Sequence, residues 1–272
     1  GVATMGKLTV LSLGWGVQSW TLAAMMALDE IPRADYVIHA DTTYELSQTY
    51  EFASKWTPWL GERGVTVHTV TGNRNGVVLQ EKNSAVMIPA FTTDANGNAG
   101  QVRRQCTGDW KIMPIRRFVR AEMERLEIKI APGVVRMQTG ITTDEIHRMR
   151  DSDVRYIENE YPLIDMGMSR LDCAFWLEKN NLSVPHKSAC TFCPYSSRRR
   201  WHELKREAGA DWAQAVEVDI AIREKRGAQL LATYVHSARM PLTEAVKIPE
   251  DVGASQPAFD GLEECESGFC WT

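Results

Sequence analysis

A short loop between an apolar run and a helical pattern is the feature that most constrains the fold of this chain. The run at residues 8–11 precedes residues 12–19, which read Ser-Leu-Gly-Trp-Gly-Val-Gln-Ser, and apolar residues at amphipathic-helix spacing follow. This order predicts a strand, a glycine-bearing turn and a helix start. Backbone N–H groups at a helix start lack partners within the helix, and the helix dipole favours an anion there. The loop therefore predicts a phosphate or sulfate cradle; a plain strand-to-helix turn is the alternative.

The first half of the chain alternates between strand and helix patterns. We expect strands at residues 7–11, 36–40, 65–70 and 134–141, and helices at residues 17–28, 46–63 and 111–126. Residues 92–100 have turn chemistry throughout and predict a loop. Repeated β–α units predict an α/β, Rossmann-like, mostly parallel sheet with helices on both faces. Farther along, we expect helices at residues 170–179, 198–207 and 212–226.

Composition excludes several classes of protein. The net charge of −4 over 272 residues gives no overall basic field, so a nucleic-acid contact would need a local patch. Basic runs at residues 103–104, 116–117 and 198–200 permit such a patch without requiring it. No apolar stretch approaches the ~18 residues of a membrane span, and we find no export signal. We expect a cytoplasmic protein with no membrane partner, and the oligomeric state stays unknown.

Polar residues follow two of the predicted strands. Asp41 and Thr42 end the second strand, where an acid can contact a ribose hydroxyl or a phosphate-bound metal ion. Capping of the next helix is the alternative. Asp144, Glu145 and Arg148 follow the strand at 134–141, so we expect them at the same sheet edge. Glu145 and Arg148 alternatively form an ordinary helical ion pair.

The cysteines suggest a metal centre. Cys190 and Cys193 form a Cys-x-x-Cys-Pro turn, a spacing that both iron–sulfur and zinc sites use. Cys106 lies among cations before a predicted helix, which makes it the natural third ligand or a reactive thiolate. We expect Cys173 to pack as a small apolar residue within its helix. Candidates for a fourth ligand are Cys173, Cys265, Cys270, an external sulfur and a substrate.

Taken in order, these stretches resemble the phosphoadenylyl-sulfate (PAPS) reductase family of the PP-loop, or adenine-nucleotide alpha-hydrolase, superfamily. The resemblance covers roughly residues 7–205. Residues 12–19 resemble the PP-loop, and 41–42 its Asp-Thr. Residues 106–114 resemble a Cys-x4-Lys-x2-Pro region, and 140–148 a Gly-x4-Glu-x2-Arg segment. The turn at 190–193 resembles the cysteine pair that binds a [4Fe-4S] cluster in adenylyl-sulfate reductases.

The resemblance implies a HUP-type fold, with an adenine-nucleotide-binding PP-loop domain at residues 5–141 and a helical, cysteine-bearing region at 142–272. It implies ATP or PAPS as the nucleotide. The implied nucleotide-binding residues are Ser12, Gly14, Gly16, Gln18, Ser19, Asp41, Thr42 and Gly140. Asp41 and Glu145 would orient ribose or Mg²⁺, while Lys111 and Arg148 would neutralise phosphate charge. Cys106, Cys190 and Cys193 would hold a [4Fe-4S] cluster, with zinc as the alternative.

The function that this resemblance favours is an ATP-dependent iron–sulfur sulfurtransferase that adenylates its substrate, as in cluster-dependent tRNA thiolases. It would need a sulfur donor, and a nucleic acid is a candidate acceptor. One alternative is an adenylyl-sulfate or PAPS reductase with Cys265 or Cys270 as nucleophile. Another is a non-catalytic nucleotide-binding module with structural zinc.

Three departures from the family pattern stand out. Gln18 occupies a position where many ATP pyrophosphatases carry Asp, and Gln105 stands where cluster-bearing reductases have the first cysteine of a pair. The tail around Cys265 and Cys270 lacks the histidine of the reductases' Glu-Cys-Gly-x-His ending.

Overall fold

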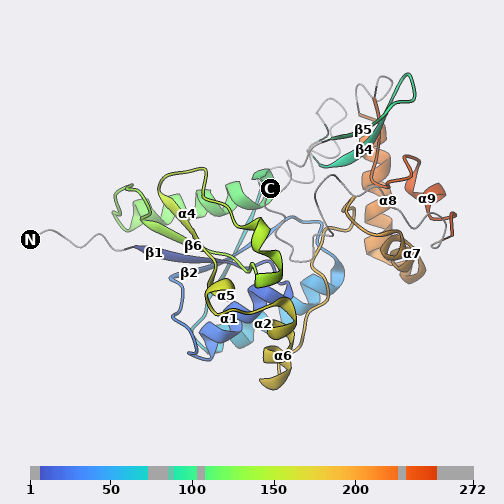
Figure 1. Cartoon of the computed structure of the whole chain (residues 1–272). Helices are drawn as coiled ribbons and strands as arrows, with labels where there is room; N and C mark the ends of the chain where they lie inside the picture. Colours follow the sequence, from blue (N-terminus) through green and yellow to red (C-terminus); the bar gives the residue numbers. More distant parts are fainter. Residues whose placement is uncertain (1–6, 73–85, 87, 103–107, 226–230, 250–272) are drawn as a thin grey trace, which may run out of the picture.

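The computed structural model describes residues 7–72, 86, 88–102, 108–225 and 231–249. A five-stranded, all-parallel sheet forms its larger part (Figure 1). The strands are, in spatial order, β3 (Val67–Thr71), β2 (Tyr36–Asp41), β1 (Leu8–Ser12), β6 (Val135–Gln138) and β7 (Ile157–Glu160). The predicted Rossmann-like α/β fold is confirmed. The chain moves outward from β1 to β3 and then returns to the other side of β1, so β1 and β6 flank the switch point where such sheets bind ligands.

Helices cover both faces of this sheet. α1 (Val17–Ala27), α2 (Ser47–Glu62) and α6 (Arg170–Lys179) lie on one face, and α4 (Met113–Arg125) lies on the other (Figure 1). Because successive side chains of a strand point to opposite faces, Leu11 joins the core under α1 while Val10 joins the core under α4. Every residue of α1 is buried. The expected amphipathic pattern of this helix is wrong, because the sheet, α2, α6 and the short α5 (Pro162–Asp165) enclose it on all sides.

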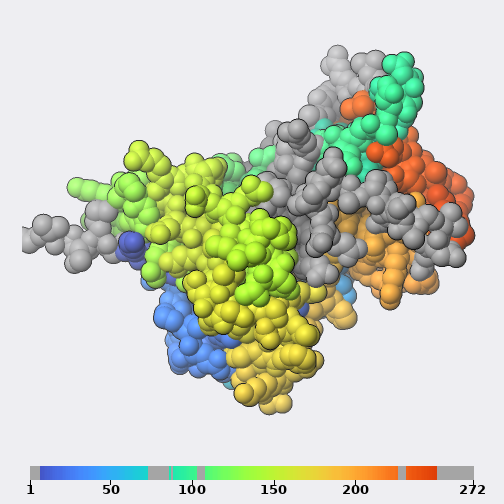
Figure 2. Space-filling model, in the orientation of Figure 1, coloured from blue at the N-terminus to red at the C-terminus, as the bar shows by residue number. Residues whose placement is uncertain are grey.

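A second, smaller sheet is antiparallel and contains β5 (Ala99–Val102), β4 (Ala90–Asp94) and β8 (Leu231–Tyr234), in that order. α7 (Arg198–Glu207), α8 (Ala210–Arg223) and α9 (Leu242–Ala245) accompany it. Their core contains Trp201, Ile222 and Val235, and Tyr44 and Leu46 from the segment after β2 reach into it. Figure 2 shows the α7–α9 part, coloured orange to red, at the opposite end of the molecule from the blue-to-yellow parallel-sheet part.

The predicted loop at residues 92–100 is instead a β-hairpin formed by β4 and β5. Asp94 closes its turn by accepting hydrogen bonds from the backbone N–H groups of Asn96 (2.9 Å) and Asn98 (2.8 Å). The polar threonines of β4 pair with β8, which is about half the chain away in sequence. The turn chemistry was therefore real, but it belongs to only the tip of the hairpin.

Neither sheet is confined to one side of residue 141 in the sequence. β7, α5 and α6 follow this position and complete the parallel sheet and its cover, whereas β4 and β5 precede it and join β8. Within the ranges that the structure describes, no helix combines the length and the apolar character needed to cross a membrane.

Candidate functional site

The loop at residues 12–19 connects β1 to α1, as predicted, and all its residues are buried. Its shape is fixed from within, since the Gly14 N–H donates to Ser19 Oγ (3.1 Å), and from outside, since Ser188 Oγ donates to the Gly14 carbonyl (2.8 Å). α1 begins after Gly16 without a side-chain cap. An uncapped helix start at the carboxyl end of a parallel strand is the arrangement that suits an anion.

Gly140 lies against this helix start. A Cβ added at residue 140 would lie 2.6 Å from the Ser19 backbone nitrogen and 3.0 Å from the Ser19 Cα. Only glycine therefore lets the segment after β6 approach the first turn of α1 so closely. The structure thus brings together Gly140 and the loop, which the sequence linked only through the family resemblance.

Two residues near the ends of β1 and β2 adopt a left-handed backbone conformation that side chains usually disfavour. Trp15 has φ of 59° and Thr43 has φ of 65°. Such conformations cost of order 1–3 kcal/mol each and cluster at functional sites. The buried Trp15 ring packs against Trp20 and Phe52, with centroid distances of 5.9 and 6.2 Å, so the core holds the loop in its strained shape. No sequence signal marks either position, because both residue types are unusual there.

Asp41 ends β2 at the same sheet edge as the loop. Its Oδ1 accepts hydrogen bonds from the Tyr50 hydroxyl and from the Thr43 N–H, both at 2.7 Å. Burial, followed by the hydrogen bond to the carboxylate, raises the pKa of Tyr50, so its hydroxyl stays protonated and donates. Asp41 therefore holds the turn after β2 together.

Glu145 and Arg148 belong to η2 (Thr143–Arg148), a short 3-10 helix after β6. Gln18 Nε2 donates to Glu145 Oε2 (3.2 Å), and Arg148 Nη1 pairs with Glu145 Oε1. Both oxygens of this carboxylate are thus engaged, one by the loop and one by its own helix. The predicted ion pair between Glu145 and Arg148 is present. The hydrogen bond from Gln18 connects this pair to the 12–19 loop.

Glu45 is a site residue that the sequence interpretation missed. It is only 2% exposed, and Lys111 from the π-helical turn η1 (Gly108–Ile112) lies 3.6 Å from its Oε1. Thr42 Oγ1 also donates to Oε1 (3.3 Å), and Ser188 Oγ lies 3.5 Å from Oε2. A buried charge is costly unless it is paired and hydrogen-bonded. Nothing in the sequence distinguishes Glu45 from an exposed acid, because its burial depends on residues more than 60 positions away.

Cys190 docks onto the segment after β2. It forms an isolated antiparallel bridge with Glu45, and its Sγ lies 3.4 Å from Thr42 Oγ1. The Cys193 N–H donates to the Cys190 carbonyl (3.1 Å), which closes the Cys-x-x-Cys turn. Burial, and then the charge of Glu45, raises the pKa of the Cys190 thiol. The structure therefore places the cysteine turn at the same edge as Asp41, Thr42 and Lys111.

The structure describes only some of the cysteines that the sequence analysis proposed as metal ligands. Cys190 and Cys193 supply two sulfur donors on one turn, which fits the spacing of thiolate-bound clusters and zinc. Across the described ranges, no group of three or more His, Cys, Asp or Glu side chains is placed to hold a metal ion. Cys106, Cys265 and Cys270 lie outside the described residues. Cys173 is fully buried within the core under α6, and burial raises the pKa of its thiol to about 12, so it packs as the expected apolar residue.

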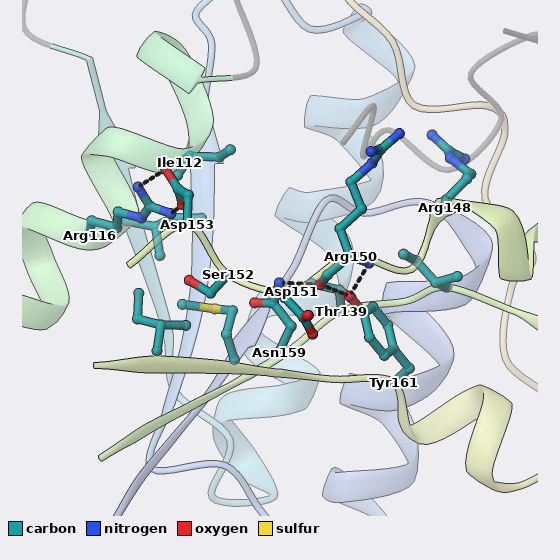
Figure 3. Close-up of a pocket in the computed structure, with 14 residues that line it drawn as sticks. Ile112, Arg116, Thr139, Arg148, Arg150, Asp151, Ser152, Asp153, Asn159 and Tyr161 are labelled. Carbon is teal, nitrogen blue, oxygen red and sulfur yellow. Dashed lines mark hydrogen bonds and ion pairs between the residues drawn. The ribbon is translucent and has the colours of Figure 1, made fainter. Parts of the chain in front are cut away.

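A cavity of about 270 Å³ opens above β6 and β7, between α4 and the segment at residues 148–153 (Figure 3). Its floor is apolar, and the guanidinium groups of Arg148 and Arg150 extend to the same side of it (Figure 3). The segment at residue 150 is held over the strand ends because Tyr161 Oη accepts from the Arg150 N–H (2.9 Å) and donates to the Arg150 carbonyl (2.6 Å). Thr139 lines the cavity, and none of the described residues forms a hydrogen bond with its buried Oγ1.

Further unpaired atoms lie at this same edge. Besides Thr139 Oγ1, the buried Ser12 Oγ, Gln18 Oε1 and Thr142 Oγ1 lack hydrogen-bond partners among the residues described. These atoms come from the end of β1, the start of α1 and the segment after β6. Since buried polar groups are rarely unsatisfied in folded proteins, their grouping indicates a place where a polar ligand supplies the missing partners.

No protein-family model matches the sequence, and no curated protein sequence matches it. The structure is similar to a crystal structure of PAPS reductase from Candida auris in a phosphate complex, with 13% identity and a TM-score of 0.42 over 65% of this chain and 74% of that one. It is also similar to the U34-tRNA thiolase NcsA from Methanococcus maripaludis with its [4Fe-4S] cluster, with 13% identity and a TM-score of 0.39 over 84% of this chain and 76% of that one.

Proposed function

We propose that this protein is an enzyme that binds an adenine nucleotide at the 12–19 loop and uses it in sulfur chemistry. The grouping of unpaired polar atoms around an uncapped helix start carries this proposal. Backbone N–H groups of the loop and the hydroxyls of Ser12 and Ser19 would bind the phosphates. The apolar cavity above β6 and β7, with the Thr139 hydroxyl in its wall, would hold the heterocyclic base.

Calorimetric titration with ATP, AMP and PAPS tests the binding step. We expect micromolar or tighter binding of at least one of them, and mutual competition between those that bind. The absence of heat and of competition with all three would contradict the proposal. Gly140→Ala is the matched variant, because its Cβ obstructs the loop, and Gly61→Ala on α2 is the control, because it adds a Cβ in open space.

Within this proposal, the favoured reaction is thiolation by an ATP-dependent iron–sulfur sulfurtransferase. Cys190 and Cys193, together with Cys106, would hold a [4Fe-4S] cluster, which supplies an iron site for sulfur. Lys111 would neutralise the phosphate charge that develops during adenylation, while Glu45 keeps its ammonium group in place. The described contact between Cys190 and Thr42 supports this assignment, because it puts the cysteine turn beside the proposed nucleotide site.

Metal analysis tests the cluster. We expect about four irons per chain after anaerobic purification, with the broad visible absorption of thiolate-bound clusters. Both should be lost in Cys190→Ser and retained in Cys173→Ser, whose thiol packs in the core. A stoichiometric zinc content instead of iron would favour the structural-zinc alternative.

One observation favours a PAPS or adenylyl-sulfate reductase as the second candidate. Asp41 and Glu145, the acids expected to orient ribose or Mg²⁺, already accept hydrogen bonds from the protein. A reductase would use Cys265 or Cys270 as its nucleophile. Sulfite release from PAPS in the presence of a thiol donor, lost in Cys265→Ser or Cys270→Ser, would select this candidate over thiolation. Possible acceptors of the thiolase, including nucleic acids, would be tested only if sulfite release is absent.

A further inference from the structure

The resemblance assigned Asp41 and Glu145 to ribose or Mg²⁺. Donors of the protein itself engage both carboxylate oxygens of Glu145 and one oxygen of Asp41. Glu145 Oε2 accepts from Gln18 Nε2 (3.2 Å), and Oε1 pairs with Arg148. Asp41 Oδ1 accepts two hydrogen bonds of 2.7 Å, from the Tyr50 hydroxyl and the Thr43 N–H. An oxygen that receives N–H or O–H groups in this way presents little free lone-pair density to a cation.

The chemistry around Glu145 does not fit Mg²⁺. Magnesium requires near-octahedral oxygen ligands at about 2.0–2.1 Å and is usually held by one or two carboxylates. Glu145 Oε2 accepts a hydrogen bond from the neutral amide of Gln18, and Glu145 Oε1 pairs with the guanidinium of Arg148. A guanidinium competes directly with a divalent cation for the same carboxylate.

The same contacts fit an anion. Arg148 is only 9% exposed, yet it lines the cavity above β6 and β7 (Figure 3). A guanidinium presents a planar fork of N–H donors that matches phosphate and sulfate oxygens. Glu145 holds Arg148 through their ion pair, and Gln18 in the first turn of α1 holds Glu145 through a hydrogen bond. The loop, the amide, the carboxylate and the guanidinium thus form one connected chain of contacts.

We propose that Arg148, positioned by Glu145 and Gln18, neutralises the anionic group of the nucleotide, and that nucleotide binding at this site needs no divalent cation. Gln18 is then a specificity-determining residue: its neutral amide joins Glu145 to the loop, whereas a carboxylate there would repel Glu145 and require a cation between them. This inference rests on the proposed function, because it assumes that a nucleotide occupies the loop.

The test is calorimetric titration of the full chain with ATP and, separately, with PAPS, each in excess EDTA and in excess MgCl2. We expect dissociation constants that agree within about threefold between the two conditions for whichever nucleotide binds. Binding that appears only with Mg²⁺, or tightens more than about tenfold with it, would overturn the inference while leaving the proposed function intact. No binding of either nucleotide under either condition would overturn both.

Substitutions at the connected residues sharpen the test. Gln18→Glu has nearly the same shape and places a second carboxylate beside Glu145, so we expect binding in EDTA to weaken at least ~10-fold and to recover with Mg²⁺ or Mn²⁺. Arg148→Gln should weaken binding at least ~10-fold in both conditions. Unchanged binding of Gln18→Glu in EDTA would contradict the inference.

The matched control is Arg136→Gln, since Arg136 is also paired with a glutamate, Glu160 at 3.2 Å, but does not line the cavity. We expect its binding to equal that of the wild type. If Arg148→Gln does not fold, as judged by thermal unfolding, Arg148→Lys keeps the charge without the fork. The inference then requires that Arg148→Lys binds several-fold more weakly than the wild type, equally with and without Mg²⁺.

Discussion

Buried polar groups are treated differently at the two ends of this molecule. In the smaller sheet, Asp219 is almost completely buried but accepts hydrogen bonds from the N–H groups of Leu242 (2.9 Å) and Val235 (3.3 Å) and pairs with Arg223 (3.2 Å). Thr233 Oγ1 there donates to the Ile222 carbonyl (2.8 Å). At the carboxyl edge of the parallel sheet, by contrast, Ser12 and Thr142 have buried hydroxyls for which the described part of the chain provides no partner. In these examples, the polar groups with complete partners hold the fold together. The unpaired groups that gather at the carboxyl edge mark where we expect a ligand.

Removal of a buried polar group that has its hydrogen-bond partners should have the largest effect on stability. Asp219→Ala leaves two buried N–H groups and Arg223 without their acceptor, so we expect it to lower the free energy of unfolding by about 3 kcal/mol. Urea denaturation measures this change. The control is Glu244→Ala, which removes only an exposed ion pair with Lys247 and should cost less than about 1 kcal/mol. Equal effects of the two variants would break the comparison between the two ends.

His236 gives a pH-dependent effect of similar size in the same part of the molecule. Burial, with the nearby charges of Arg198 and His202, lowers the pKa of His236 to about 4. In the unfolded chain the imidazole of His236 takes up a proton near the ordinary histidine pKa of about 6.5, whereas in the folded chain it stays neutral at that pH. Stability should therefore be complete above about pH 6.5 and fall by roughly 3 kcal/mol as the pH drops to about 4.

Urea midpoints measured between pH 7 and pH 4 would check this expectation for His236. His236→Asn keeps an acceptor for the Ala238 N–H, which now donates to His236 Nδ1 (3.0 Å), but it cannot titrate. The stability profile of this variant should be flatter than that of the wild type across the interval. Identical profiles would show that His236 does not cause the pH dependence.

Gly140→Ala should have a smaller effect on stability but a strong effect on the site. Its Cβ would force the Ser19 backbone away, and such overpacking costs about 1–3 kcal/mol. We expect nucleotide affinity to fall at least ~10-fold, because the displaced atoms belong to the anion cradle. Gly61→Ala should leave the affinity unchanged.

The smallest and most direct contrast uses two threonines. Thr142→Val removes an unpaired buried hydroxyl and should stabilise the ligand-free protein by about 1 kcal/mol, whereas Thr233→Val removes a paired one and should destabilise it by about the same amount. Thermal unfolding measures both changes. The increase in Tm on addition of nucleotide should be smaller for Thr142→Val than for the wild type and unchanged for Thr233→Val. Changes of equal sign in the two variants would contradict the interpretation.

The sequence predicted four of the five strands of the parallel sheet, because each of these strands has a clear pattern in consecutive residues. β7 was missed, since its short polar sequence was expected to form a loop. Helices at 170–179 and 198–207 have the predicted bounds. The hairpin of β4 and β5 was missed because its pairing partner β8 is remote and its strands contain polar threonines. An exposed face of α1 was expected and the burial of Glu45 was not, for the same reason. Burial depends on which other segments cover a residue, and a local sequence pattern does not contain this information.

The candidate site was predicted in outline. The sequence pointed to the loop, to Asp41 and to Glu145 with Arg148, and the structure brings these to one edge. It did not reveal that Gln18 joins Glu145, since they are 127 positions apart. The left-handed conformations of Trp15 and Thr43 were equally hidden, because residue type favours other conformations there.

Trp15 has a consequence for how this loop can evolve. Its backbone shapes the turn, while its indole ring fills space among Trp20, Phe52 and His39. A descendant that exchanged Trp15 for glycine would relieve the backbone but leave a void as large as an indole in the hydrophobic interior. Change in this loop is therefore tied to compensating change in α1 and α2, and a loop transplanted from a glycine-rich homologue would need its neighbouring helices to come with it.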